Sequence, residues 1–330
     1  MGQVSFRLAF SAALAVTLLV VPFAGTSRAH ICTPDPEVPA PGSLLIPQAS
    51  GLARFSFADR LVETLPVLPS SGLVSQVARS SDGTRLALAR FSRTEGESIG
   101  GSDVLITGPD GGAVLDRLER TRPGELIAAP AWHPRGGLVF ERSTVSGGTS
   151  AARIEWRQAD DAMVTLVERG ASPTVSHDGR WLAYIHAQQG DRLMLRDLAG
   201  GEERVLVADT AFLAIAFPRF SPNGEWLAFA AAGEPVAAPL PSVGLTGWRP
   251  GPALAQAHGV PWDTWAVRVS DGVVTRLSSY YDDDPAVAWS PDGWWVAMFA
   301  GESIKAIAVD GSASYCVLGT GGYGGLEWIE

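Results

Sequence analysis

The sequence has few of the residues that most often perform catalysis or hold metals. Its 330 residues include two cysteines, five histidines and a single lysine, Lys305. No Cys-x-x-Cys, His-x-His or HExxH pattern occurs, so a zinc site has no motif to support it. A G-x-S-x-G nucleophile elbow and a phosphate-binding glycine loop are also missing. The sequence therefore predicts no metal, no cofactor and no catalytic residue.

Positive charge is also scarce. Lysine and arginine number 25 against 35 acidic residues, which gives a formal net charge of −10. An acidic, lysine-poor chain is a poor ligand for nucleic acid or for an anionic membrane surface. We therefore expect no nucleic-acid partner, and no membrane contact beyond a possible N-terminal anchor.

The one long apolar run lies at the amino terminus. It extends from Leu8 to Gly25, after Arg7 and before Ser27-Arg28-Ala29. Small residues at 27 and 29 fit a signal-peptidase site, which predicts a signal peptide over 1–29 and an exported, periplasmic, extracellular or cell-surface protein. An uncleaved anchor is the alternative, because about 18 apolar residues can just span a bilayer. Lipidation of Cys32 is not expected, because no Leu-small-small pattern precedes it.

A repeated hairpin dominates the rest of the chain. Residues 285–300, PAVAWSPDGWWVAMFA, predict a strand, a tight Ser-Pro-Asp-Gly turn and a second strand. Related hairpins occupy 78–91, 130–141, 173–186 and 217–230. Their turn glycines are Gly83, Gly136, Gly179, Gly224 and Gly293, with successive separations of 43 to 69 residues. Such a period predicts a β-propeller.

Two copies of the hairpin carry a family resemblance. Phe220-Ser-Pro-Asn-Gly224 and Trp289-Ser-Pro-Asp-Gly293 resemble the repeat of TolB-type β-propellers. The copies at Gly83 and Gly179 lack the proline, and Trp132 to Gly136 lacks the aspartate and is one residue short. The resemblance implies a non-enzymatic exported protein that binds other proteins in the bacterial envelope. TolB has an additional amino-terminal domain that this chain lacks, so a role in the Tol–Pal system is not implied.

Strand counting predicts an all-β, six-bladed propeller over 48–330, preceded by a proline-rich lead-in over 30–47. Each hairpin is followed by two more predicted strands, at 103–107 and 113–118, 152–157 and 163–168, 192–197 and 203–207, 262–269 and 272–277, and 304–309 and 313–318. The sixth blade joins 325–329 to strands at 43–47, 52–58 and 61–68. Cys32 and Cys316 both map to this closure, which favours a disulfide over two unrelated thiols.

Strand parity sorts the loops into two ends of the propeller. The Ser-Pro-Asp-Gly turns fall at the bottom, whereas the insertion 233–261 and the run Tyr280 to Asp284 fall at the top. Because loops on a rigid scaffold usually carry binding, we predict a binding site there. Its predicted contacts are Asp282, Asp283, Asp284, Trp248, Trp262 and Tyr281. The alternatives are a decorative insertion, a strand cap at Asp284, and a Ca²⁺ or Mg²⁺ site.

Most tryptophans and histidines have structural explanations. Trp132, Trp289 and Trp328 occupy inner-strand positions, and we expect them to pack between blades. His133 and His177 lie in bottom turns, and we expect both to be solvent-exposed. Besides the protein-binding scaffold, two functions stay open: a sugar- or peptide-binding module, and a propeller lyase or lactonase. Prolyl-oligopeptidase-type peptidases carry similar propellers, but we expect no hydrolase domain here. We expect a monomer.

Overall fold

A computed structural model describes residues 32–49, 51–66, 72–93, 95–145, 152–187, 190–233, 262–280, 282 and 285–330. Within these ranges the regular elements are all β-strands, and none of the described residues forms a helix that could cross a membrane. The all-β class predicted from the sequence is confirmed. The predicted signal peptide and the body of the predicted insertion, 234–261, lie outside the described residues.

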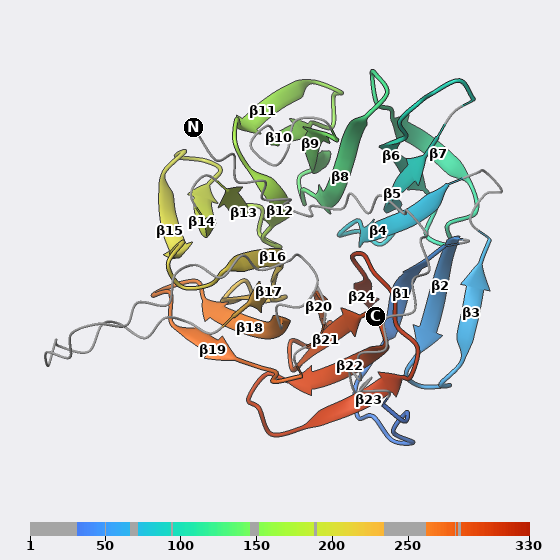
Figure 1. Ribbon diagram of the computed structural model, residues 1–330, viewed down its shortest axis with the longest axis vertical. Coiled ribbons are helices and arrows are strands. Elements are labelled where there is room, and N and C mark those ends of the chain that lie inside the picture. Colours follow the sequence, from blue (N-terminus) through green and yellow to red (C-terminus); the bar gives the residue numbers. More distant parts are fainter. Residues whose placement is uncertain are drawn as a thin grey trace, which may run out of the picture.

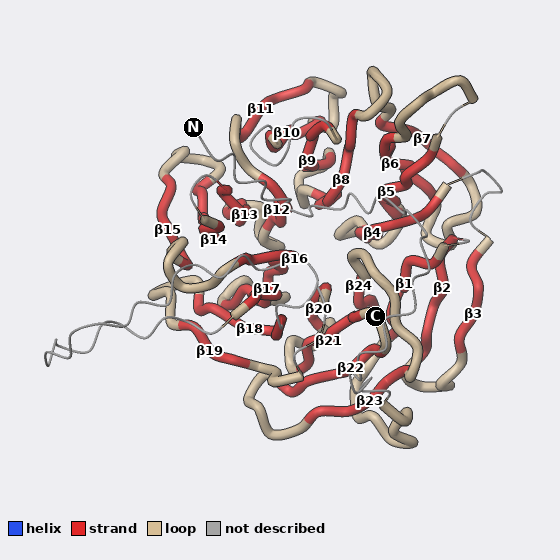
Figure 2. The backbone as a smooth tube through the Cα atoms, viewed as in Figure 1, coloured by secondary structure: helices blue, strands red, loops and turns tan. Residues whose placement is uncertain are grey.

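The strands form antiparallel sheets arranged around a common centre (Figure 1, Figure 2). One sheet has the order β24 (Glu327–Ile329), β1 (Ser43–Gln48), β2 (Gly51–Ser56) and β3 (Val62–Leu65). An eight-stranded sheet contains β4 (Leu73–Arg79), β5 (Leu86–Ser92), β6 (Gly101–Thr107) and β7 (Val114–Leu118), then β8 (Glu125–Trp132), β9 (Leu138–Thr144), β10 (Arg153–Arg157) and β11 (Met163–Val167). Its two halves meet at the parallel pair Ser102 and Leu126.

Three further four-stranded sheets complete the arrangement. They are β12 (Ala171–Val175), β13 (Trp181–Ala187), β14 (Asp191–Asp197) and β15 (Glu203–Val207); β16 (Ala214–Phe220), β17 (Trp226–Ala232), β18 (Trp262–Arg268) and β19 (Val274–Arg276); and β20 (Ala286–Trp289), β21 (Trp295–Ala300), β22 (Ser303–Ala308) and β23 (Ser314–Leu318). The strands β4, β8, β12, β16, β20 and β24 lie nearest the centre (Figure 1). The strands follow the sequence prediction closely, while the count of six blades stays a prediction.

The repeated turns share one hydrogen-bond pattern. In the turn of β20 and β21, the Ser290 hydroxyl donates to Asp292 Oδ1 at 2.6 Å and accepts from the Trp295 backbone N–H at 2.9 Å. Gly293 closes the turn by donating to the Ser290 carbonyl at 2.9 Å, with a φ of 75° that glycine adopts without strain. Ser80, Ser176 and Ser221 make the equivalent contacts in their own turns. The motif therefore builds the scaffold.

The turn between β8 and β9 departs from this pattern and corrects one prediction. His133 takes the place of the serine, and its Nδ1 accepts the Arg135 backbone N–H at 3.1 Å. The prediction that His133 is solvent-exposed is wrong: it is only 4% exposed, and its ring stacks on Trp156 with centroids 4.6 Å apart. The Gly179 turn of the next sheet packs over it, with a Cβ at 179 only 3.1 Å from the imidazole. His177 is exposed, as expected.

Both ends of the described chain meet in one sheet. Leu44 and Leu45 of β1 pair with Trp328 and Glu327 of β24. A disulfide joins Cys32 to Cys316, as predicted, and Asp35 next to it donates its backbone N–H to the Cys316 carbonyl at 2.9 Å. The bridge closes a separation of 284 residues. In the chain-entropy model such a crosslink stabilises the fold by about 5–6 kcal/mol.

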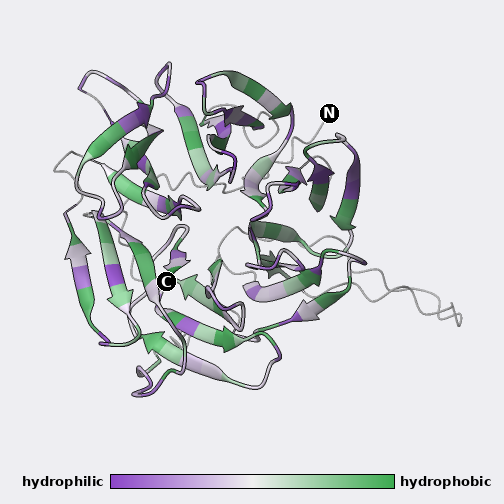
Figure 3. Ribbon diagram, turned by 180° about the vertical axis from the view of Figure 1, so that it is seen from behind, coloured by the Kyte–Doolittle hydropathy of each residue, from purple (hydrophilic) through white to green (hydrophobic). Residues whose placement is uncertain are grey.

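Hydrophobic clusters fill the spaces between neighbouring sheets. One cluster joins Ala228 of β17 to Val287 and Trp289 of β20. The Trp289 indole donates to the Arg219 carbonyl of the preceding inner strand at 2.9 Å, and Trp132 does the same to Ala78 at 3.1 Å. Figure 3 shows hydrophobic residues along the strands and hydrophilic residues in many of the turns. The inner-strand tryptophans are therefore packing residues that also tie sheet to sheet.

Candidate functional site

The top face is the end of the sheets at which the inner strands begin. Trp262, the first residue of β18, donates its backbone N–H to the Asp282 carbonyl at 3.0 Å, and the two residues form an isolated antiparallel bridge. Both ends of the predicted insertion, at Ala232 and Trp262, are paired on this face. Two predicted contact residues are thus brought together. Trp248, Tyr281, Asp283 and Asp284 lie outside the described residues and stay predictions.

Asp282 makes an ion pair within the protein. Its Oδ2 lies 3.1 Å from Lys305 Nζ, and the two side chains are only 14% and 6% exposed. The Lys305 ammonium also lies 4.1 Å from the centre of the Tyr280 ring, in a cation–π contact. The charge of Asp282 is therefore balanced inside the protein, so this residue positions the loop more than it attracts a ligand.

Asp263 holds the path of the segment that leads to the acidic run. Its Oδ1 accepts the Ser278 hydroxyl at 2.8 Å and the Tyr280 backbone N–H at 2.8 Å. Its Oδ2 accepts Arg276 Nη2 at 2.6 Å. Because Asp263 is buried, these charge-assisted bonds fix the segment 276–280 against β18. The connection that follows β19 is therefore held in place by side-chain contacts as far as Tyr280.

Acidic residues near the start of the third strand in other sheets also hold a following segment in place. Asp103 of β6 accepts the Arg120 backbone N–H at 2.7 Å, and Asp191 of β14 accepts that of Ile215 at 3.0 Å. In each case a carboxylate on the third strand fixes the connection into the next inner strand. β22 carries Lys305 instead, and its partner acid is Asp282, on the connection that enters the same sheet.

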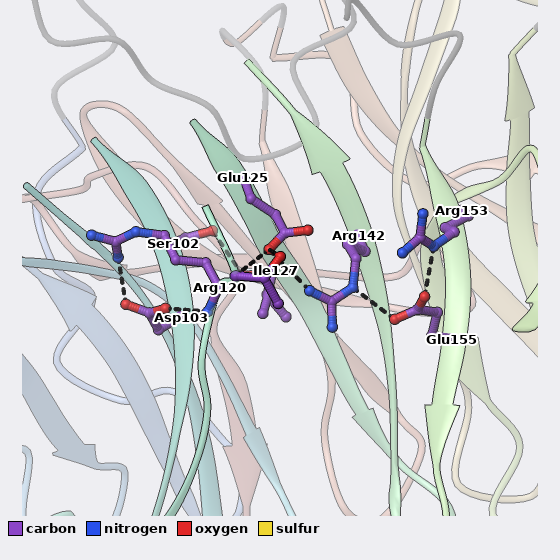
Figure 4. A network of polar contacts seen from close by, with 9 residues as sticks. Ser102, Asp103, Arg120, Glu125, Ile127, Arg142, Arg153 and Glu155 are labelled. Carbon is purple, nitrogen blue, oxygen red and sulfur yellow. Dashed lines mark hydrogen bonds and ion pairs between the residues drawn. The ribbon is translucent and has the colours of Figure 1, made fainter. Parts of the chain in front are cut away.

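A chain of charges, most of them buried, runs across the same end of the eight-stranded sheet (Figure 4). Arg142 lies 3.2 Å from Glu125 and 2.7 Å from Glu155, and Glu155 also pairs with Arg153 at 2.6 Å. A second group pairs Arg120 with Asp103 at 2.5 Å. Acids and bases alternate, so each charge has a partner of the opposite sign. Such a set of paired charges is consistent with a rigid, structural role for this end of the sheet.

The ionisation of Glu125 argues against a role as catalytic acid or base. Burial alone would raise its pKa, but hydrogen bonds from Thr121 and the positive charge of Arg142 outweigh burial, and the net pKa is lowered. A catalytic acid or base needs a pKa close to the working pH. In the described part of the chain, no three His, Cys, Asp or Glu side chains are placed to hold a metal ion.

Sequence reasoning missed the structural partners of the predicted site. Lys305 carried a signal, because it is the one lysine of the chain. Its pairing joins β22 to Asp282 on the connection between β19 and β20, and so could not be derived from spacing. Arg142 and Glu155 belong to different strands of one sheet, and nothing local marks them as partners. Their pairing became visible only once strand register was known.

Comparisons with known proteins agree with the propeller. No family model matches the chain. TolB from Acinetobacter baumannii superposes with a TM-score of 0.62 at 16% identity, over 87% of this chain and 66% of that one. A protein of Agrobacterium tumefaciens described as TolB gives a TM-score of 0.57 at 16% identity, over 86% and 92% of the two chains. The chain thus spans just under two thirds of the Acinetobacter protein.

One curated relative is similar in sequence over part of its length. The uncharacterized peptidase YuxL of Bacillus subtilis (strain 168) is 30% identical over 148 residues. The match covers 40% of this chain and 22% of that protein. The chain therefore spans about a fifth of the relative, whose activity is not carried over by such a match.

Proposed function

We propose that this chain, which has the TolB-like β-propeller fold, is exported to the bacterial envelope and works there as a non-enzymatic, protein-binding scaffold. Its sheets would form six blades around the centre. The observation that carries the proposal is the structural likeness to two TolB proteins over more than four fifths of the chain. A disulfide between Cys32 and Cys316 supports export, because such bonds persist in oxidising compartments.

The working face would be the top, around Trp262 and the acidic run. The described part of this face is rigid, because Asp263 and Lys305 fix the segment that leads to the acids. Rigid loops lose little entropy when a partner binds. Since Asp282 is engaged by Lys305, the free charge would come from Asp283 and Asp284. A partner with a basic surface fits this face best.

The experiment uses variants that spare the Asp282 ion pair. The protein is labelled and titrated with solubilised envelope proteins, and the captured partner is then measured by surface plasmon resonance. Asp283→Asn combined with Asp284→Asn should lower the affinity, and added salt should reduce wild-type binding to a similar degree. The matched control is Asp310→Asn, in an exposed turn of the fifth sheet. Unchanged affinity in the double variant would reject the acidic run as the contact.

A second candidate is a peptide-binding propeller associated with peptidase chemistry. The partial sequence similarity to a protein named as a peptidase favours it. The test is an incubation of the protein with a mixed peptide library, followed by mass spectrometry. Retention of intact peptides would support peptide binding, and cleaved products would support hydrolysis. A protein that neither retains nor cleaves peptides would leave the scaffold as the better account.

A further inference from the structure

Two charged residues interrupt a position that is otherwise small in the repeat. The residue two places before the turn serine, or before His133 in its place, is small and uncharged in four inner strands: Ala78, Ala131, Thr174 and Ala288. In β16 this residue is Arg219, and in β24, aligned on Trp328, it is Glu327. Both strands lie next to the centre of the ring (Figure 1). Arg219 and Glu327, the two residues that depart from the repeat, therefore carry opposite charges at equivalent positions of two inner strands.

Arg219 extends toward the opposite side of the centre. A β-bulge in β16 lies between Ala216 and Arg219, and such bulges re-aim side chains. The Arg219 Nη2 atom would lie 3.3 Å from a Cβ placed at Gly325. Gly325 itself is paired with Gln76 of β4, which Figure 1 places across the centre from β16. Because residue 325 is a glycine, no side chain fills the space beside the Arg219 guanidinium.

Most hydrogen-bonding capacity of Arg219 is unused by the described chain. A guanidinium has five N–H donors. Among the described residues, its one side-chain hydrogen bond goes from Nη1 to the Pro218 carbonyl, at 3.0 Å. Burial lowers the pKa of Arg219, and the charge of Glu327 opposes that change. Arg219 as a whole residue is intermediate in exposure, neither buried nor fully exposed.

Glu327 is the nearby acid, and it has no side-chain hydrogen bond within the described chain. Burial raises its pKa from 4.5 to about 7, while the positive charges of Arg219 on β16 and Arg79 on β4 oppose the rise. The other strands packed against β24 are β1 and β20, and neither contains a charged residue. Near neutral pH the carboxyl of Glu327 is therefore divided between its charged and neutral forms.

We propose that Arg219 is the binding residue of an axial site for a carboxylate, and that Glu327 is its internal competitor. The incoming carboxylate accepts two parallel N–H bonds from the guanidinium, the geometry that arginine favours. Glu327 takes up one proton from solution when the ligand binds, because two carboxylates beside one arginine repel each other. The carboxylate belongs to a free small acid or to an acidic side chain of a peptide. This inference does not depend on the envelope scaffold proposal.

The experiment titrates succinate into the purified protein by isothermal titration calorimetry between pH 6 and pH 8.5. The dissociation constant should rise toward about tenfold per pH unit above pH 7, since one proton is linked to binding. Heats measured in buffers of different ionisation enthalpy should report uptake of up to one proton. An acetylated, amidated peptide that contains aspartate is the second probe. Binding of succinate identifies a free acid as the source, and binding of the peptide alone identifies a partner's side chain.

Variants separate binding from folding. Glu327→Gln should bind as tightly as the wild type does at low pH, with no pH dependence. Arg219→Gln should abolish binding, and Arg219→Lys, which keeps the charge but loses the fork, should weaken it. Arg54→Gln is the control, because Arg54 is exposed and pairs only with Glu63, at 2.8 Å, in the described chain. Thermal unfolding confirms that each variant is folded.

Three results would overturn the proposal. The first is a wild type that binds neither probe, and the second is binding that is independent of pH. The third is full binding by both Arg219 variants. If Arg219→Gln fails to fold, Arg219→Lys and Glu327→Gln still decide the outcome, because one must weaken binding and the other must remove its pH dependence.

Discussion

Lys305 and Asp282 form an ion pair 3.1 Å apart, with both side chains largely shielded from water. The pair joins the third strand of the fifth sheet to the connection that enters the same sheet. Tyr280 covers the ammonium on one side, at 4.1 Å from its ring centre. The one lysine of the chain thus neutralises the first acid of the run that the sequence marks as a ligand site.

Removal of the lysine should destabilise the protein. Lys305→Met leaves the largely buried Asp282 without its partner, and breaking such a pair costs about 3–5 kcal/mol. Adding Asp282→Asn should restore much of the loss, because the uncompensated charge is then gone. Urea unfolding of the single and double variants measures both effects. Additive losses in the double variant would mean that the two residues are not coupled.

The disulfide should contribute more stability than any single surface contact. Cys32→Ser combined with Cys316→Ser should lower the free energy of unfolding by about 5–6 kcal/mol, because the closed loop is long. Mass spectrometry of the non-reduced wild type should find no free thiol. Equal unfolding free energies for the wild type and the double variant would contradict a closure role for the bridge.

The stability of the wild type should fall between pH 4.5 and pH 7. Glu327 has its pKa raised from 4.5 to about 7, so the folded state keeps a proton that the unfolded state releases in this window. The linked contribution is fully present below pH 4.5 and is lost by pH 7, up to about 3 kcal/mol. Glu327→Gln should remove this part of the pH profile. Glu63→Gln, at an exposed ion pair, is the control. Identical pH profiles for wild type and Glu327→Gln would contradict the shift.

The first repeat offers a matched test of the turn motif. Ser80 donates to Asp82 at 2.6 Å and accepts the Arg85 N–H at 3.0 Å, whereas its neighbour Ser81 is exposed. Ser80→Ala should cost about 1 kcal/mol, because the two hydrogen bonds that order the turn are lost. It should also raise the pKa of Asp82, which the Ser80 hydroxyl, with the help of Thr84, lowers to about 2. NMR titration measures the pKa, and Ser81→Ala should change neither quantity.

The repeat made most of the fold predictable. Its turn chemistry is local, since Ser290, Asp292 and Gly293 satisfy one another within five residues. The closure by β24 and the Cys32 to Cys316 bridge followed from leftover strands at the two ends. The exposure of His133 was predicted wrongly because a turn of the neighbouring sheet covers it. The local sequence around His133 contains no information about that contact.

The candidate site was less accessible to sequence reasoning. Strand parity placed Trp262 and Asp282 at the same end of the propeller, but it did not predict the backbone bridge between them. Lys305 reaches Asp282 on the connection that enters its sheet, and Arg219, next to a bulge in β16, extends toward Gly325. Such directions depend on register and packing, which spacing alone leaves open.

The most direct test of the account is a crosslinking measurement that compares the two faces. A photoreactive amino acid is placed at residue 283 in the acidic run, or at residue 135 or 223 in the bottom turns, and the protein is exposed to native envelope extract. The account predicts a specific protein adduct from residue 283 that salt diminishes, and none from the bottom positions. Adducts only from residues 135 or 223 would contradict the assignment of the top face as the working surface.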